Sequence, residues 1–559
     1  MTWDLSCPDW VARLQSGRSL VPTLPLDQRE GDRAVAVFNR LRLADVPRTP
    51  TMEEAGGDWF RDIVRALFGS MDPVTRARNV RELFLLIPKK NSKTTNGALL
   101  MLTALLLNQR PNASLIMTAP VQDVAQLAFD AAAGAIELDD VLKRKLHVRE
   151  HLKTIEHRET HAELRIMTFD PATLTGQKPV AVLIDELHVV AKMAKAASAL
   201  RQLRGGMLPY PEAFMAFITT QSEEAPAGVF KAELMKARAI RDGRQEGAML
   251  PVLYEFPPEM QCDRDAWRDT ANWPMVTPNA GRSISIGRLI EDARTAEQTS
   301  PEEFLSWASQ HLNVEVGLAL RSGGWAGAEF WERNAEPDLT LDALIAQSEV
   351  IVTGIDGGGL DDLLGFAAIG RTPTGNWLHW GHAWAHPSVL KRRKSEAPRL
   401  QDLAAGGHLT LSEHIGDDVA DVADLVLRIE ASGKLADKGV GVDPVGIGSI
   451  HDALIEGELD PARIVGVSQG WRLAGAITTT ERRLAQGTLR HGGSPLMNWC
   501  VGNCKVEARA NGKLITKAAS GTAKIDPVMA LLNAVSLMSL NPEAVGGNLD
   551  LAINSPIHS

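Results

Sequence analysis

Two neighbouring acids, Asp185 and Glu186, follow a short, continuous apolar segment of this chain. Residues 180–184 are Val-Ala-Val-Leu-Ile, which predicts a strand buried on both faces, as in the middle of a parallel sheet. Open α/β sheets bind their ligands at the carboxyl ends of such strands. In nucleotide hydrolysis, Asp185 would hold a magnesium ion and Glu186 would polarise the attacking water. For this pair alone, two solvated acids at the end of a surface strand are an equal alternative.

A second candidate site has the order strand, polar loop, helix. An apolar strand is predicted at 83–87, and a polar loop leads from it into a helical pattern that begins at Thr94. Backbone N–H groups at such a helix start bind phosphate, Lys93 would reach the terminal phosphates, and the Thr94 hydroxyl would ligate magnesium. Ile87 and Ser92 stand where the usual phosphate-binding motif has glycines. The motif alone would therefore describe a basic surface loop before a helix better than a phosphate-binding loop.

Both motifs need a sheet to bring them together, and the chain supplies further strands for it. Residues 113–118 and 213–220 are short and apolar, with helical segments between the strands. A parallel sheet is the economical solution for this alternation. The second segment ends in Thr219 and Thr220, which would lie beside the nucleotide and sense its γ-phosphate, with an ordinary strand end as the alternative.

Three aspartates in the second half of the chain lie at strand ends or at a helix start. Asp356 ends the apolar segment 350–355, Asp443 ends another, and Asp526 precedes an apolar helix predicted at 527–540. Carboxylates so placed suit two divalent metals that activate water and stabilise the leaving oxygen in phosphodiester cleavage. A ribonuclease-H-like domain is built in this way, although a single aspartate is more often a cap or turn residue.

Composition limits the class of protein. The 559 residues predict two to four domains, and 44% hydrophobic with 23% charged residues is typical of a globular chain. No apolar run approaches the roughly 18 residues of a membrane span. The four scattered cysteines are too few for a disulfide framework, which favours the reducing cytosol. Cys500 and Cys504 are interpreted as structural thiols. The net charge of −10 excludes a uniformly basic nucleic-acid surface but not a local basic channel.

Two basic features are candidates for contacts outside the nucleotide site. A helix predicted at 193–203 ends at Arg204-Gly205-Gly206, where Arg204 is a possible arginine finger. The run 391–394, Lys-Arg-Arg-Lys, could grip DNA phosphates, and a solvated loop is equally compatible with it.

Together and in this order, the motifs resemble those of the large subunit of tailed-bacteriophage terminases, the motor-nuclease that packages viral DNA. The resemblance runs from about residue 59 to residue 540. It rests on the phosphate loop 88–94, Thr173–Gly176 before 184–188, Thr219-Thr220, 311–314, and the segments 354–362, 439–444, 491–499 and 524–530.

This resemblance implies an α/β fold with two main parts. The first is an additional-strand P-loop ATPase domain with a parallel sheet, and the second is a ribonuclease-H-like α/β nuclease domain. The implied limits are 1–50 for an N-terminal arm, 51–335 for the ATPase domain with linker helices at its end, 336–545 for the nuclease domain and 546–559 for a flexible tail.

The resemblance also implies roles for individual residues. ATP would be bound by Lys89, Lys90, Asn91, Ser92, Lys93, Thr94 and Asp185, with Glu186 as the base and Thr219 and Thr220 as the coupling motif. Metals would be held by Thr94 and Asp185 in the first domain and by the catalytic Asp356, Asp443 and Asp526 in the second, with Asp362 as a weaker candidate. The chain departs from the family pattern at Ser92, at Phe60 in place of a frequent glutamine, and at Gln221-Ser222 in place of Ala-Gly.

The implied function is ATP-driven translocation of double-stranded DNA into a procapsid, with cleavage of concatemers. ATP and Mg²⁺, or Mn²⁺ at the nuclease site, would be the cofactors. The implied partners are double-stranded DNA, a small terminase subunit, the portal protein and further copies of the chain in a ring, in the host cytoplasm and without a membrane. The alternatives are a helicase-like DNA translocase with a non-cutting C-terminal domain, and a non-enzymatic scaffold, for which Ser92 is the best support.

Overall fold

The computed structural model describes residues 3–193, 195–315, 325–394, 396–445, 448–509, 512–517 and 524–544. The chain divides into two compact units, Met1–Val316 and Gly317–Ser559. This division falls within residues 316–324, which lie outside the described ranges, and the domain limits inferred from the sequence stay predictions. Within the described ranges, no helix is both long enough and apolar enough to cross a bilayer.

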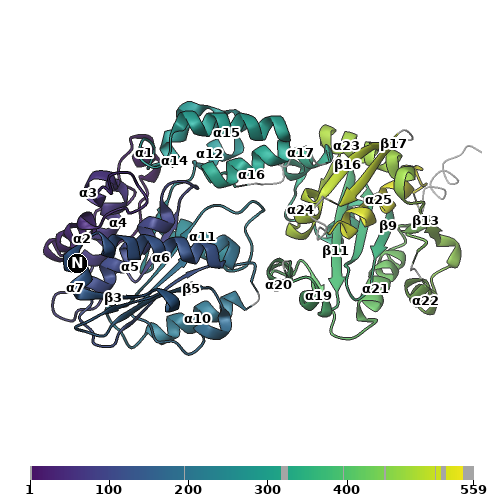
Figure 1. Cartoon of the computed structure of the whole chain (residues 1–559). Helices are drawn as coiled ribbons and strands as arrows, with labels where there is room; N and C mark the ends of the chain where they lie inside the picture. The colour runs from purple at the N-terminus through teal and green to yellow at the C-terminus, as the bar shows by residue number, and fades with distance from the viewer. Residues whose placement is uncertain are drawn as a thin grey trace, which may run out of the picture. The chain divides into compact units, whose positions relative to one another are not determined.

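The first unit contains an eight-stranded sheet with the order β3-β4-β5-β2-β6-β7-β1-β8 (Figure 1). All neighbours from β5 to β8 are parallel, and β3 and β4 extend the sheet as an antiparallel hairpin. The strands are β1 Glu82–Leu86, β2 Ser114–Ala119, β3 Leu146–Arg149, β4 Thr154–His157, β5 Glu163–Thr168, β6 Ala181–Asp185, β7 Phe214–Thr219 and β8 Met249–Leu253.

The order of the central strands decides the class of this sheet. β7 lies between β1, which precedes the phosphate loop, and β6, which carries Asp185. β7 is therefore the additional strand of an additional-strand ATPase fold. All residues of β6 and β7 are buried, as expected for strands with helices on both faces.

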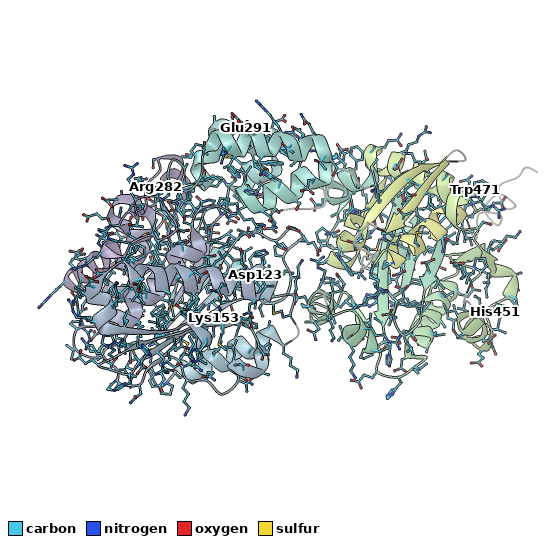
Figure 2. All side chains as sticks on the ribbon, viewed as in Figure 1. Asp123, Lys153, Arg282, Glu291, His451 and Trp471 are labelled. Carbon is cyan, nitrogen blue, oxygen red and sulfur yellow. The ribbon has the colours of Figure 1, made fainter. Side chains whose placement is uncertain are left out.

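Helices surround this sheet and extend beyond it. They are α1 Trp10–Gln15, α2 Gln28–Arg40, α3 Met52–Ala55, α4 Asp58–Gly69, α5 Lys93–Leu107, α6 Gln122–Glu137, α7 Asp140–Lys145, α8 Pro171–Leu174, α9 Leu187–Val190, α10 Ala196–Met207, α11 Gly228–Arg241, α12 Pro258–Cys262, α13 Arg264–Arg268, α14 Trp273–Val276, α15 Ile286–Thr299 and α16 Pro301–Leu312. Helix α2 packs on α4 through Phe38 and Phe60, whose ring centroids are 5.5 Å apart. Figure 2 labels Glu291, whose side chain lies on the solvent-exposed face of α15.

Helix α5 places the phosphate loop over the middle of the sheet. It is apolar on every face after its first turn and buried along most of its length, which is the pattern of a helix covered on all sides. A Cβ on Gly97 would lie 3.2 Å from Leu183 of β6 and 3.1 Å from Ile218 of β7. The helix therefore lies close against the two strands that end in Asp185 and Thr219.

The second unit contains a sheet with the order β12-β11-β10-β9-β13-β14, and β15 pairs with β11. Strands β9, β10 and β11 form an antiparallel meander, while β13 is parallel to β9 and β14 to β13. This is the ribonuclease-H-like strand order, so the predicted fold class is confirmed for both units. The strands are β9 Val350–Gly357, β10 Leu364–Arg371, β11 Trp377–Ala385, β12 Thr410–Leu411, β13 Leu435–Val442, β14 Ile464–Gly466, β15 Leu489–His491, β16 Cys504–Arg509 and β17 Gly512–Lys517.

Nine helices are described in this unit, and the last of them packs across the sheet. They are α17 Gly327–Trp331, α18 Leu341–Gln347, α19 Ser388–Arg392, α20 Ala397–Ala405, α21 Asp417–Ala431, α22 Gly448–Glu456, α23 Ala474–Gln486, α24 Pro495–Gly502 and α25 Asp526–Met538. A Cβ on Gly365 of β10 would lie only 2.8 Å from the Cα of Pro527. Glycine at this position therefore lets the start of α25 lie directly on the strand.

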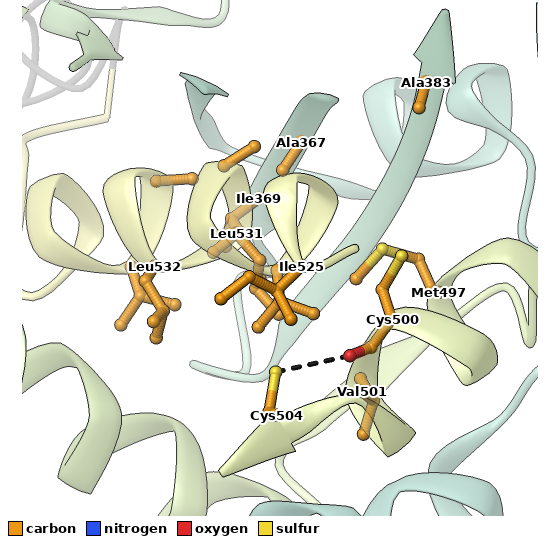
Figure 3. Packing of buried hydrophobic residues seen from close by; sticks show 14 of the residues in the cluster. Ala367, Ile369, Ala383, Met497, Cys500, Val501, Cys504, Ile525, Leu531 and Leu532 are labelled. Atoms are coloured by element: carbon orange, nitrogen blue, oxygen red, sulfur yellow. Dashed lines mark hydrogen bonds between the residues drawn. The ribbon is translucent and has the colours of Figure 1, made fainter. Parts of the chain in front are cut away.

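The core between α25 and the sheet includes the two cysteines near the end of the chain. Figure 3 shows Ile369 of β10 and Leu531 of α25 beside Cys500 and Cys504. Both thiols are free and buried, and Cys504 Sγ donates to the Cys500 carbonyl at 3.3 Å. Burial raises the pKa of both thiols, so they are structural core residues.

Candidate active sites

The loop between β1 and α5 carries the residues predicted to bind phosphate. Ser92 precedes α5 with φ 56° and ψ 29°, in the left-handed region that residues other than glycine seldom adopt. Lys90 also has a positive φ of 68°. Serine thus keeps the backbone conformation that glycine provides in the usual motif.

The two sequence motifs of the first unit meet at the start of α5. Lys93 Nζ lies 2.8 Å from Glu186 Oε1, and the Thr94 hydroxyl donates to Asp185 Oδ2 at 2.6 Å. Asp185 is fully buried, and Lys93 is 8% exposed. Glu186 has φ 54° at the junction of β6 and α9, a conformation that is costly and typical of functional sites. Residues 91 positions apart in the chain therefore share one site.

The end of β7 lies beside this site. The Thr219 hydroxyl accepts a hydrogen bond from the His188 backbone N–H at 3.2 Å and lies 3.0 Å from His188 Nδ1. Thr220 is fully buried, and its hydroxyl has no hydrogen-bond partner among the described residues. His188 is thus a hydrogen-bonding residue between the Asp185-Glu186 pair and the threonines.

The aspartates of the second unit gather at one edge of its sheet. Asp356 lies at the end of β9, and the parallel register pairs Val442 of β13 with Ile355 of β9, which puts Asp443 beside Asp356. Asp526 begins α25, and a Cβ on Gly357 would lie 3.2 Å from Asp526 Cβ. The fold therefore brings three acids from distant segments to the same end of the sheet.

Asp362 is paired with the side chain of a buried lysine. Lys524 is fully buried, its ammonium forms a close ion pair with Asp362, and it also donates to the Asp361 carbonyl at 2.8 Å. Across the described ranges, no three His, Cys, Asp or Glu side chains form a group that could hold a metal ion. Metal binding by Asp356, Asp362, Asp443 and Asp526 stays a prediction.

Comparison with known families decides what these two sites belong to. The family model for the terminase large subunit, ATPase domain, matches residues 58–234. The model for the terminase large subunit, endonuclease domain, matches residues 253–541, more than half of the chain. This chain belongs to the terminase large-subunit family. It accordingly has an ATPase domain and an endonuclease domain, with ATPase and endonuclease activity.

Two curated proteins and one solved terminase structure are similar to this chain at low sequence identity. The large terminase subunit of Enterobacteria phage HK97 is 21% identical over 481 residues, 85% of this chain and 90% of that protein. Protein YmfN of Escherichia coli K12 is 21% identical over 372 residues, 64% of this chain and 77% of that protein. The crystal structure of the HK97 large terminase aligns at 20% identity with a TM-score of 0.46, covering 91% of this chain and 99% of that one.

The electrostatics of the terminase ATPase site fit a bound cation. Burial, followed by the charge of Glu186, raises the pKa of Asp185 to about 6. A divalent cation beside Asp185 would offset this cost, because it stabilises the ionised carboxylate. Burial also lowers the pKa of His188 to about 4, so this imidazole is neutral and adds no competing positive charge at neutral pH. Thr94 and Asp185 are the residues that would hold Mg²⁺.

One carboxylate oxygen of Glu186 has no hydrogen-bond donor among the described residues and lies 3.4 Å from His188 Nδ1. Glu186 Oε1 faces Lys93, while its Oε2 is buried and accepts no hydrogen bond from the described residues. A buried acceptor without a donor is costly.

Residues after β8 hold the phosphate loop, and the sequence motifs did not reveal them. The buried Asn91 side chain accepts from the Asn279 backbone N–H at 3.0 Å, and Ser283 Oγ donates to the Lys90 carbonyl at 2.6 Å. The Lys89 N–H donates to the Gln310 carbonyl at 2.7 Å. The Asn91 side chain thus braces the loop, and its part in ATP binding stays a prediction. These partners are about 190 to 220 positions distant in the chain, so no local pattern points to them.

The predicted helix end at Gly205-Gly206 was wrong, and Arg204 has partners of its own. Helix α10 continues to Met207 because its side chains pack on the unit, which outweighs the low helix propensity of glycine. Arg204 lies 2.6 Å from Glu82 and 2.7 Å from Glu233. These two acids hold its guanidinium within the first unit, which opposes a role as an arginine finger.

Proposed function

We propose that this terminase large subunit uses ATP hydrolysis in its first unit to translocate double-stranded viral DNA into a procapsid, and that its second unit cuts concatemeric DNA. The observation that carries the proposal is the meeting of Lys93 and Thr94 with Glu186 and Asp185 at the end of a parallel sheet. Backbone N–H groups at the start of α5 add the donors that bind phosphate.

The roles in ATP hydrolysis follow from these contacts. Lys93 would exchange Glu186 for a terminal phosphate oxygen, because a phosphate carries more charge than one carboxylate. Glu186, released from Lys93, would orient the attacking water and accept its proton. Mg²⁺ held by Thr94 and Asp185 would neutralise charge on the β- and γ-phosphates. Thr219 and Thr220 would couple the loss of the γ-phosphate to a conformational change in the rest of the first unit.

In the second unit, Asp356, Asp443 and Asp526 would hold two divalent metals, Mg²⁺ or Mn²⁺. Such ions activate water and stabilise the leaving oxygen of the phosphodiester. The donor set of carboxylate oxygens suits these hard cations. Lys524 would keep Asp362 in place by its ion pair and neutralise one of the negative charges at this edge of the sheet.

Packaging would need other protein chains in addition to this one. We propose further copies of the chain in a ring, a small terminase subunit and the portal protein of the procapsid, acting in the host cytoplasm. The competing proposal is a helicase-like DNA translocase whose second unit does not cut. It would be favoured by ATP turnover without cleavage.

The test measures ATP turnover and plasmid cleavage on the same full-length preparations, with Mg²⁺ or Mn²⁺. Glu186→Gln should abolish ATP turnover and retain cleavage, whereas Asp443→Ala should do the reverse. Asp437→Ala changes an exposed aspartate of β13, the strand that precedes Asp443, and should affect neither. Equal cleavage by wild type and Asp443→Ala would refute the proposed nuclease site. Absence of ATP turnover in the wild type, with or without DNA, would favour a scaffold.

A further inference from the structure

One segment of the first unit, Gln310–Glu315, contacts the nucleotide site at two points. At the phosphate loop, the Lys89 ammonium donates to the Gln310 side-chain oxygen, and the Lys89 N–H donates to the Gln310 carbonyl at 2.7 Å. The Gln310 amide nitrogen donates to Glu223, which follows β7. Gln310 is 8% exposed. Its amide therefore bridges a cation of the phosphate loop and an acid beyond the coupling threonines.

The second contact lies directly after Thr220. The Gln221 N–H donates to Asn313 Oδ1 at 2.9 Å, and Asn313 Nδ2 donates to the Tyr254 carbonyl at 2.9 Å. Asn313 ends α16 with φ 53°. Glu315 lies 2.8 Å from Arg238, and the Gln221 amide lies 3.4 Å from the same carboxylate. The chain between α16 and residue 315 is thus held to the end of β7 as well as to the phosphate loop.

The contact between Lys89 and Gln310 is one that bound ATP would disturb. In the structure the ammonium of Lys89 donates to a neutral amide oxygen, and its backbone N–H donates to a neutral carbonyl. A γ-phosphate oxygen carries negative charge, so it attracts the Lys89 ammonium by Coulomb interaction as well as by a hydrogen bond, whereas the Gln310 amide oxygen carries no net charge. Lys89 would therefore leave Gln310 for the phosphate when ATP binds. The Gln310 side chain would then keep Glu223 as its partner and no longer hold Lys89.

We propose that Gln310 is a positioning residue that holds Lys89 on α16 in the absence of nucleotide and releases it to ATP, so that the segment Gln310–Glu315 responds to occupancy of the site. The inference rests on the proposed ATPase function and adds to it a residue outside the known motifs. It requires a coupling between Lys89 and Gln310 that depends on nucleotide. A merely structural role for Gln310 would not produce this coupling.

The test is a double-mutant cycle on the full-length chain, with calorimetric binding of the non-hydrolysable analogue AMP-PNP in the presence of Mg²⁺. Gln310→Met removes the amide but keeps the length of the side chain, and should lower the Kd about threefold to tenfold because Lys89 is no longer held. Lys89→Met should raise the Kd about tenfold. In the Lys89→Met background, Gln310→Met should have no effect. Gln298→Met on the exposed face of α15 is the matched control and should leave the Kd unchanged.

A second measurement separates positioning from stability. Hydrogen exchange of peptides that cover residues 301–315 should rise in the wild type when AMP-PNP binds, and should be raised already and independent of nucleotide in Gln310→Met. A higher Kd for Gln310→Met, or the same change in both backgrounds, would overturn the proposal. If the wild type neither binds AMP-PNP nor turns over ATP, the proposed function itself fails. If it does both while the cycle is additive, only the role of Gln310 fails.

Discussion

At the scale of single residues, the nucleotide site depends on a few short contacts made by buried groups. Asp185 has no exposed surface and relies on the Thr94 hydroxyl and the Glu186 backbone N–H for hydrogen bonds. Burial raises its pKa to about 6. Loss of one donor is therefore costly, because the carboxylate cannot turn to solvent instead.

Thr94→Ala should lower kcat/KM for ATP about tenfold to hundredfold, because a hydrogen bond to a charged group contributes about 1.5–3 kcal/mol. The Mg²⁺ concentration for half-maximal turnover should rise as well, since the hydroxyl is a predicted ligand. Steady-state ATPase assays over a Mg²⁺ titration check both expectations. Thr95→Ala, one residue further along α5, is the control. A loss of the same size in both variants would contradict the assignment.

At the scale of elements, helix α25 positions an acid by lying directly on the sheet. Its first turn fits over β10 because residue 365 has no side chain. The approach is close enough that the neighbouring atoms cannot yield without moving the helix start, and Asp526 is the first residue of that helix.

Gly365→Ala should lower the free energy of unfolding by about 1–3 kcal/mol, as overpacking of a core does. It should also reduce DNA cleavage while ATP turnover persists. Gly475→Ala is a control of opposite sign, because a Cβ on Gly475 of α23 meets no atom within 4 Å and alanine favours a helix by about 0.5–1 kcal/mol. Chemical denaturation and plasmid cleavage provide the readouts. Unchanged stability of Gly365→Ala would show that α25 can shift at no cost.

The basic run at the end of α19 is joined to the loop that follows Asp356. Ser388 Oγ donates to the Leu360 carbonyl at 2.6 Å, and Arg393 Nε donates to the Asp361 carbonyl at 3.1 Å. Lys391, Arg392 and Lys394 are at least partly exposed. Arg393 is thus a structural anchor, and the other three cations reach solvent next to the loop that follows Asp356.

Replacing Lys391, Arg392 and Lys394 together by alanine should weaken binding of double-stranded DNA to the full-length chain. The slope of log K against log salt concentration should fall by about 0.9 for each phosphate that the variant no longer neutralises. Anisotropy titrations at several salt concentrations measure it. Lys438→Ala and Arg482→Ala, at cations of the same unit that also reach solvent, should keep the wild-type slope. An unchanged slope in the triple variant would favour a solvated loop that does not bind DNA.

At the scale of the whole molecule, buried neutral histidines make stability depend on pH. Burial lowers the pKa of His188, His311, His382 and His491 to about 4, and that of His379 to about 3, from an ordinary value of 6.5. The unfolded chain therefore binds more protons than the folded one between about pH 3 and pH 6.5. Protonation of these histidines in the unfolded chain lowers the free energy of unfolding. Their contribution to this free energy is therefore fully present above pH 6.5 and is lost as the pH falls toward the pKa values of the folded state.

The midpoint of urea unfolding should therefore fall steadily between about pH 7 and pH 5. His379→Leu should flatten this dependence, whatever its stability at neutral pH, because it removes the most strongly shifted group. His451→Leu, at an exposed histidine labelled in Figure 2, should keep the wild-type slope. A steeper fall in His379→Leu would contradict the sign of the linkage.

Much of the architecture follows from local patterns in the sequence. The apolar segment before Asp185 and the apolar helix after Lys93 are β6 and α5, because burial on both faces leaves a continuous run of apolar residues. The segment 284–312 forms α15 and α16 with an interruption at Ser300-Pro301, where proline begins the second helix. Helix α10 shows the limit of such patterns, because it continues through Gly205 and Gly206 to Met207, where side-chain packing outweighs the low helix propensity of glycine.

The sequence by itself indicated which residues could bind phosphate and metal, because the separate motifs occur together and in one order along the chain, although each motif alone had another interpretation. Only the tertiary structure decided what holds them. The residues that support the phosphate loop lie about 190 to 220 positions away in the chain and are Asn279, Ser283 and Gln310. Lys524 forms its ion pair with Asp362, which lies 162 positions earlier in the sequence. Contacts of this kind arise from the packing of whole elements, which satisfies buried polar groups with whichever donor the fold brings near. No periodicity or local motif encodes them.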